Sequence, residues 1–390
     1  MSKIIDTRLN DFSLPVHISS DNEYVNSLDN VLCAYSKHIH SIIGLQPQTV
    51  KKTESNIETI KNILKLYFNG YIGDAITQTK LIIRDYVKEP YFVSDFDKSY
   101  AFRGIAPIKM LQKKFGYDKA YSEQYKKMNE TPISLFRGRI SKEILDKEDM
   151  LHIPYDLREK VSTQRYSMSG IPCMYLTTSS LGSYLELGNP NYKDFYLSSF
   201  QIESNNLKLL NLCITQHTIN GAATGYVEEY EIQHISNLIE IFPLVIASSF
   251  VVDTKKERNF KTEYIIPQLI MMAINDLGID AVAYLSVQMS DSYSYPHCVN
   301  IALPMKSASL YRKYSEFCNE IKFTKSTCFD DCLISLGVSN SHSYINEIYN
   351  ENDSKSKVEI NNNICMYQDT IYSKVDDILV SQPHTTIKIV

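Results

Sequence analysis

The chain has 390 residues, of which 44% are hydrophobic and 22% charged, a composition typical of a soluble globular protein that buries a large core. Its formal net charge of -5 disfavours a protein whose main work is to coat nucleic acid, because such binding needs a basic face that displaces counterions. The sequence contains no apolar run long enough to span a bilayer and no secretory signal at its start, so it predicts a cytoplasmic protein without a membrane partner.

Eight cysteines are scattered along the chain without a repeated pair spacing. In a reducing compartment such residues serve as small buried hydrophobes. Cys328 and Cys332 are the one close pair, and a zinc ion there would need two further ligands. The sequence therefore predicts no metal site.

Residues 1–129 read mainly as helices, which we expect at 26–35, 55–68, 74–88 and 108–129. The apolar residues that mark one face of the first two are Leu28, Val31, Leu32, Tyr35, Ile57, Ile60, Leu64 and Phe68. A capping box that begins at Ser55 predicts the start of the second helix, and the following glycines predict its end. We therefore expect a mainly helical N-terminal domain with a regulatory or recognition role.

At residue 130 the pattern changes, and residues 133–140 alternate with the period of a strand. The alternation places Arg137 and Arg139 on the same side of that strand. Two guanidinium groups on one face repel each other unless an anion or a carboxylate neutralises them. Either one arginine is salt-bridged and the other exposed, or the two form a pocket for phosphate oxygens, which the planar guanidinium fork suits.

The segment that begins at Arg165 contains the residue types of a small anion-binding catalytic site. Tyr166 follows the arginine, and a short strand that contains Tyr175 comes next. A Thr-Thr-Ser-Ser stretch then predicts the cap of a helix, near whose start Glu186 stands among apolar neighbours. A glutamate in this setting is either exposed by the helical turn or placed to do chemistry.

Further along, the sequence alternates strands with buried helices. The expected strands are 197–202, 207–212, 281–287 and 298–304, and the expected helices are 235–252, broken by Pro243, 262–275 and 310–321. The third of these strands carries Ser286 at its end. We place an α+β domain at 130–320 and a C-terminal extension of short strands and turns at 321–390.

Several features of the chain follow one another in a characteristic order. They are Leu-Phe-Arg137, Arg165-Tyr166, Tyr175-Leu, Glu186 eleven residues after Tyr175, and Ser286 at a strand end before Asn300. Over about residues 131–305 this succession resembles the RES-domain family, which is named for its Arg, Glu and Ser. The extended Arg-Tyr-Ser-x-x-Gly-x-Pro-Cys-x-Tyr-Leu motif is similar to that of larger members, which carry a helical domain in front.

The resemblance implies a fold similar to ADP-ribosyltransferase toxins and an activity that breaks the bond between nicotinamide and ribose in NAD. NAD would be a substrate, and no metal is required. Family members are commonly toxins of toxin–antitoxin pairs, which implies growth arrest or phage defence as the role and an antitoxin or a trigger protein as partner. The oligomeric state is left open, and a homo-oligomer is one alternative. The implied catalytic residues are Glu186, Arg165, Tyr175 and Ser286, and the implied NAD-binding residues are Arg137, Arg165, Tyr166, Tyr175 and Ser286.

The chemistry of these residue types agrees with the implied reaction. Cleavage of an N-glycosidic bond passes through an oxocarbenium-like transition state, which a carboxylate near the ribose stabilises. Arginines can hold the pyrophosphate of the dinucleotide, and tyrosine rings offer flat surfaces for a base. A serine hydroxyl can hydrogen-bond a ribose hydroxyl or the nicotinamide amide.

Two departures from the family pattern keep other interpretations open. Shorter members carry Gly-Gly where this chain has Thr163-Gln164, and several place a functional serine where this chain has Thr262 and Tyr264. The same bond cleavage also serves ADP-ribosyl transfer to a macromolecule. A non-catalytic binding module with a degenerate pocket is the alternative from another class.

Overall fold

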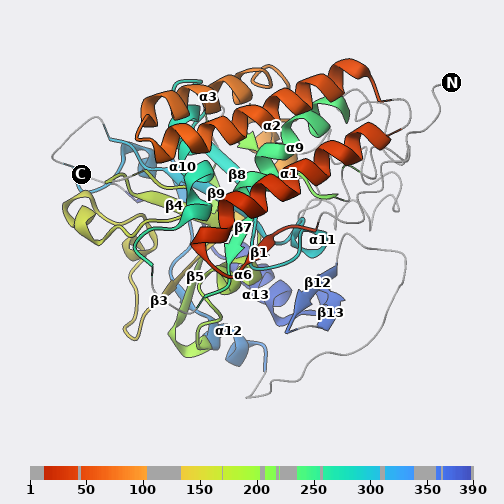
Figure 1. Cartoon of the computed structure of the whole chain (residues 1–390). Coiled ribbons are helices and arrows are strands. Elements are labelled where there is room, and N and C mark those ends of the chain that lie inside the picture. Colours follow the sequence, from red (N-terminus) through yellow and green to blue (C-terminus); the bar gives the residue numbers. More distant parts are fainter. Residues whose placement is uncertain are drawn as a thin grey trace.

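The computed structural model describes residues 13–42, 45–102, 133–168, 170–202, 207–216, 219, 235–254, 258–307, 312–337, 357–361 and 363–387. They form an α+β fold in which a twisted mixed sheet is covered on one face by two layers of helices (Figure 1). This fold class and the helical N-terminal region confirm the prediction from sequence. The expected helix at 108–129 lies outside the described residues. Among the helices that the structure does describe, none combines the length and the apolar character needed to cross a membrane.

The N-terminal region consists of strand β1 (Val16–Ile18) and helices α1 (Tyr24–Ser41), α2 (Pro47–Phe68) and α3 (Ile72–Arg84). The predicted start of the second helix at Ser55 is wrong, because α2 begins eight residues earlier with a proline in its first turn. Proline suits that position, since its fixed φ is helical and its missing N–H would have no partner there. Phe68, predicted to lie on the apolar face, is the last residue of α2 and is 52% exposed.

The described part of the central sheet has nine strands. They are β2 (Val93–Asp95), β3 (Ser134–Ile140), β4 (Cys173–Thr177), β5 (Phe195–Ile202), β6 (Lys208–Asn211), β8 (Ala281–Leu285), β9 (Val299–Pro304), β10 (Ile321–Phe323) and β11 (Thr327–Cys328). The order is β10-β5-β3-β4-β9-β8-β6-β2, with β11 also paired to β5. Among the described strand pairs of this sheet, β6 and β8 run parallel and the others antiparallel. Strands β3 and β4 pair at a single position, Phe136 with Thr177, so their backbones are largely unpaired with each other.

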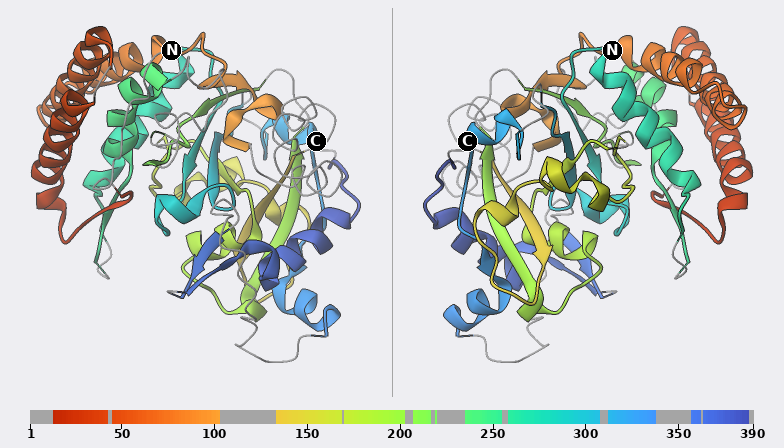
Figure 2. Two further views of the ribbon diagram at one scale, coloured as in Figure 1. Left: turned by 90° about the vertical axis from the view of Figure 1, so that its right-hand side faces the viewer. Right: turned by 90° about the vertical axis from the view of Figure 1, so that its left-hand side faces the viewer.

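Two layers of helices lie over the β4-β9-β8 face of the sheet, as the two side views in Figure 2 show. The inner layer is α9 (Ile235–Ser248) and α10 (Ile265–Asn275), and α1, α2 and α3 pack on its outer side. One apolar cluster runs through both layers to the sheet. In addition, β1 pairs with β7 (Phe250–Val252), and β2 is an edge strand of the central sheet. The domain boundary predicted at residue 129 stays a prediction, but the N-terminal helices share their core with the rest of the chain.

Helix α9 continues through Pro243, where the sequence led us to expect a break. A proline inside a helix has no N–H to donate to the carbonyl four residues earlier, which here belongs to Ile239. Tyr35 of α1 supplies the missing donor, because its hydroxyl lies 2.9 Å from that carbonyl oxygen. The Asn56 amide of α2 donates to the next carbonyl, that of Glu240, at 2.8 Å. The N-terminal helices therefore complete the hydrogen bonding of α9.

The C-terminal segment contains the hairpin β12 (Lys357–Ile360) and β13 (Asn363–Met366), and the helices α12 (Phe329–Ser335) and α13 (Ile371–Ser381). Our expectation of only short strands and turns was therefore wrong for α13, whose apolar residues pack under α6 (Ser180–Glu186) in a cluster of their own. The helix predicted at 310–321 is also wrong in its described part. Ser315 caps a single turn of 3-10 helix there, and Ile321 already begins β10.

The remaining short elements are α11 (Asp291–Ser294) and the 3-10 turns Asp21–Glu23, Phe96–Lys98, Tyr100–Phe102, Glu148–Met150, Tyr155–Lys160, Tyr192–Asp194, Thr262–Tyr264, Glu316–Asn319 and Tyr367–Asp369.

Candidate active site

Helix α6 carries the candidate carboxylate at its C-terminal end. Ser179 is its N-cap, and the Ser179 hydroxyl accepts a hydrogen bond from the Gly182 N–H at 3.0 Å, which confirms the predicted cap. The prediction that Glu186 stands near the start of the helix is wrong, because α6 has only seven residues and Glu186 is the last. Gly188 follows with a φ of 74°, a left-handed conformation that stops the helix. The Glu186 side chain is exposed.

Two hydrogen bonds fix one oxygen of this carboxylate. Glu186 Oε1 accepts from the Ser286 hydroxyl at 2.6 Å and from the Asn300 amide at 2.6 Å. Both donors are 2% exposed. The Ser286 hydroxyl in turn accepts from the Gln288 N–H at 3.2 Å, which fixes its orientation toward the carboxylate. Among the described residues nothing donates to Glu186 Oε2, so this oxygen is left for a ligand or for solvent.

The register of three strands explains why these side chains meet. Thr177 of β4, Asn300 of β9 and Tyr284 of β8 are cross-strand partners, so their side chains share one face of the sheet. Ser286 lies two residues beyond Tyr284 and continues that face as β8 ends. No role was predicted for Asn300, because the residue opposite a given strand position depends on register, which one strand alone does not reveal.

Tyr166 and Tyr284 pack together on this face, with their ring centroids 4.3 Å apart and their planes inclined by 36°. Burial raises the pKa of Tyr166 to about 12. Burial raises the pKa of Tyr284 too, and the negative charge of Glu186 adds to that shift, which shows how near the two groups lie. Tyr166 is only 1% exposed, so in this structure it supports Tyr284 and does not present a free face to a base.

Tyr175 of β4 lies on the same side of the sheet as Tyr284 of β8, with β9 between them, and it is partly exposed. Burial of the hydroxyl, with smaller effects of the nearby Cys173 and Tyr284, raises its pKa well above the usual range. That hydroxyl oxygen is buried and makes no hydrogen bond of good geometry with a described residue. Buried polar atoms without partners are rare, and they often mark places where a ligand or a water binds.

Arg137 lies at the gap between β3 and β4, next to the Phe136 that shares the face of Thr177. Its Nη1 donates to the backbone oxygen of Tyr175 at 3.0 Å, a carbonyl that β3 leaves unpaired, while its buried Nε has no partner among the described residues. Burial, assisted by the charge of Arg139, lowers the pKa of Arg137 to about 9. Arg139 donates instead to the backbone oxygen of Leu151 at 2.9 Å. No carboxylate in the described part of the chain forms an ion pair with Arg137.

Arg165 is held away from Glu186 by two backbone carbonyls. Its Nη1 donates to the oxygen of Ser248, the last residue of α9, at 3.0 Å, and its Nη2 donates to that of Phe250 at 2.9 Å. The Tyr264 ring lies against the guanidinium at 5.0 Å. A cation at a helix C-terminus satisfies free carbonyls and the helix dipole together. The predicted contact of Arg165 with phosphate stays a prediction. In the structure Arg165 stabilises the turn after α9.

We expect Arg165→Lys to lower the free energy of unfolding by about 2 kcal/mol, because a single ammonium cannot span both carbonyls and leaves a buried acceptor unsatisfied. Urea denaturation followed by circular dichroism measures the change. The matched control is Arg84→Lys, at an exposed position in the last turn of α3, which should stay within about 0.5 kcal/mol of wild type. Equal stability of the two variants would contradict the structural role.

The other positions considered for a functional serine lie elsewhere. The Thr262 hydroxyl donates to Asp21 Oδ1 at 2.9 Å, and Tyr264 lies against Arg165. Of these side chains, Ser286 is the one that contacts Glu186. Within the described residues, no three side chains of His, Cys, Asp or Glu lie close enough together to hold a metal ion.

Helix α13 fixes the other end of α6. Asp376 Oδ1 accepts from the Ser180 N–H at 2.9 Å, and its Oδ2 accepts from the Tyr367 hydroxyl at 2.5 Å. The Ser180 hydroxyl donates to the backbone oxygen of Tyr372 at 3.2 Å. A carboxylate on the first N–H groups of a helix is favourable, because those groups lack intrahelical partners. The C-terminal segment thus helps to set where α6 presents Glu186.

Comparison with known proteins yields one relative of note. The chain is 24% identical over 317 residues to the curated protein named "Putative toxin YopC" from Bacillus subtilis (strain 168). The alignment covers 78% of this chain but 65% of the relative, so the chain spans less than two thirds of that protein's length. No family model matches the chain. No solved structure matches it either. The chain is therefore similar, over most of its own length, to a larger curated protein whose printed name is that of a toxin.

Proposed function

We propose that the chain is a toxin-like enzyme that consumes NAD by breaking the bond between nicotinamide and ribose. The observation that carries the proposal is the arrangement at Glu186, an exposed carboxylate with one oxygen fixed by Ser286 and Asn300 and the other open. A carboxylate held in this way can stabilise positive charge that develops on a ribose ring. The name of the bacterial relative agrees with a toxic activity.

Unsatisfied polar atoms on the neighbouring strands β9, β4 and β3 support a ligand of mixed character. Asn300 Oδ1, Tyr175 Oη and Arg137 Nε are buried atoms that make no hydrogen bond of good geometry with a described residue. An amide oxygen, a hydroxyl and a guanidinium suit the carboxamide, hydroxyl and phosphate groups of a dinucleotide. Arg137 also lacks a carboxylate partner, and a bound anion would compensate its buried charge.

In the proposed reaction, Glu186 Oε2 faces the ribose carbon that carries nicotinamide. The carbon–nitrogen bond breaks and its electron pair leaves with nicotinamide, while water adds to the ribose carbon and loses a proton. Ser286 and Asn300 hold the carboxylate in place throughout. Phosphate in place of water gives phosphorolysis, and a group on a macromolecule gives ADP-ribosyl transfer. Toxicity through loss of NAD requires action inside a cell, where an antitoxin or a trigger would have to control it.

Incubation of the purified chain with NAD tests the proposal. We expect free nicotinamide to accumulate, and with NAD labelled in its adenosine moiety the label should appear in ADP-ribose or, with phosphate as acceptor, in its phosphorylated form. Label that stays on protein or nucleic acid would indicate transfer. Intact NAD after incubation with cell extract and wild-type protein would contradict the proposed activity and favour a binding module.

A further inference from the structure

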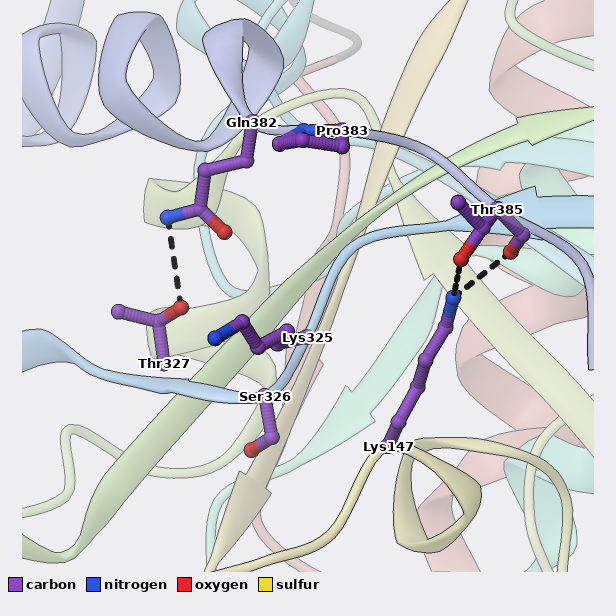
Figure 3. A pocket seen from close by; sticks show the side chains of 7 residues that line it. All are labelled: Lys147, Lys325, Ser326, Thr327, Gln382, Pro383 and Thr385. Atoms are coloured by element: carbon purple, nitrogen blue, oxygen red, sulfur yellow. Dashed lines mark hydrogen bonds between the residues drawn. The ribbon is translucent and has the colours of Figure 1, made fainter.

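A pocket whose lining contains none of the candidate active-site residues lies where three distant segments meet (Figure 3). Its volume is about 520 Å³. It is lined by Lys147, Lys325, Ser326, Thr327, Gln382, Pro383 and Thr385, which come from the loop after β3, the connection from β10 to β11, and the chain after α13. This size lies within the range of sites for small organic ligands.

The lining of the pocket is positively charged and contains no carboxylate. Lys147 Nζ donates to the backbone oxygen of Thr385 at 2.7 Å and to its hydroxyl at 2.5 Å, and it lies 4.5 Å from the centre of the Phe323 ring. Lys325 is exposed and runs toward Gln382 and Thr327 in Figure 3. Within the described residues, neither lysine forms an ion pair with Asp or Glu, so the charge at this pocket is uncompensated.

The pKa values of two groups at the pocket, Lys147 and His384, are lowered. Burial lowers the pKa of Lys147, which has no negative partner to offset its desolvation. The pKa of His384 is lowered by burial and also by the charge of Lys147. In addition, Ser326 Oγ is buried without a hydrogen-bond partner among the described residues. An anion in the pocket would offset the charge and accept hydrogen bonds from the donors around it.

We propose that this pocket binds a small phosphate-bearing ligand of about the size of a nucleoside monophosphate. The phosphate group accepts hydrogen bonds from the Lys325 ammonium, Lys147 adds positive charge from the other side of the pocket, and the remaining volume, lined by Gln382, Thr327 and Pro383, holds a neutral polar part. This site is separate from Glu186 and does not depend on the activity proposed there. It would therefore bind its ligand whether or not the chain cleaves NAD.

Ligand-observed nuclear magnetic resonance with the full-length chain tests the site, with AMP, inorganic phosphate and adenosine as probes. We expect AMP to bind with a dissociation constant in the range of about 0.1 to 1 mM, phosphate more weakly, and adenosine not at all. Lys325→Gln should weaken AMP binding about fivefold, as expected for an exposed charge pair. This lysine makes no hydrogen bond or ion pair with a described residue, so the variant should fold.

The matched control is Lys374→Gln, an exposed lysine on α13 that does not line the pocket. Its affinity for AMP should equal that of wild type. Absence of AMP binding at 10 times the expected range, equal binding of adenosine and AMP, or equal affinity of the two lysine variants for AMP would each overturn the proposal. The last outcome would show that any AMP bound sits elsewhere, including at the candidate active site.

Discussion

Replacement of Glu186 with glutamine is expected to lower the rate of nicotinamide release from NAD by about 100- to 1000-fold, the range for loss of one electrostatic stabiliser of a transition state. Glutamine keeps an oxygen that can accept the hydrogen bonds from Ser286 and Asn300, so the local geometry should persist. Only the negative charge is removed. The variant should therefore unfold at the same temperature as wild type.

The measurement is nicotinamide release at saturating NAD, combined with a thermal melt of each variant. Glu143→Gln is the control, because Glu143 is an exposed glutamate in the loop after β3, away from the site. Ser286→Ala and Asn300→Ala should each cost about tenfold, because one fixing hydrogen bond is lost while the carboxylate remains. Activity of Glu186→Gln equal to that of wild type would exclude Glu186 as the catalytic carboxylate.

The sequence was sufficient to predict most strands of the central sheet and the pairing of Glu186 with Ser286 as candidate residues. Strand periodicity located β3, β4, β5 and β8 within a few residues, because alternation in a half-buried strand is a local signal. The order of motifs also selected Glu186 and Ser286, which the structure places 2.6 Å apart. Whether these residues are catalytic stays a prediction until activity is measured.

What the sequence could not show depends on contacts between distant segments. Arg165 donates hydrogen bonds to the backbone oxygens of Ser248 and Phe250, which are more than eighty residues away. No local sequence pattern predicts these bonds. The role of Asn300 follows from strand register, which is a property of the sheet and not of one strand. The start of α2 was misplaced because Ser55 and Glu58 match a capping box, although the helix was already formed there.

Pro243 shows the same limit in one helix. From the sequence alone a proline predicts a break, because it removes a donor and crowds the preceding turn. The tyrosine that supplies a replacement donor, Tyr35, lies in a helix that the sequence placed in a separate domain. A tertiary contact overrides the local propensity at this proline. The same contact joins the N-terminal helix α1 to α9.

Deletion of residues 1–102 is expected to abolish cooperative folding of the remaining chain. The deletion removes α1, α2 and α3, and it exposes the outer apolar side of α9, including Phe242, which packs against Tyr35 at 5.4 Å. Each large side chain returned to water costs about 1.5 to 3 kcal/mol, so a few of them exceed the whole stability of about 5 to 15 kcal/mol of a typical domain. The Ile239 carbonyl, which Pro243 leaves without a helical donor, adds to this cost once Tyr35 is removed.

Thermal unfolding by circular dichroism, with a dye that binds exposed apolar surface, measures the outcome. We expect the truncated chain to bind the dye and to show no sharp transition. In the full-length chain, Phe242→Ala should lower stability by about 3 to 5 kcal/mol, whereas Tyr71→Ala, at a side chain that is 60% exposed, should change it by less than about 0.5 kcal/mol. A truncated chain that unfolds sharply at the wild-type temperature would instead show that the N-terminal helices form a separable domain, as the sequence predicted. Loss of folding would mean that these helices are a structural part of the unit that presents Glu186, because they share one apolar core with α9, α10 and the sheet.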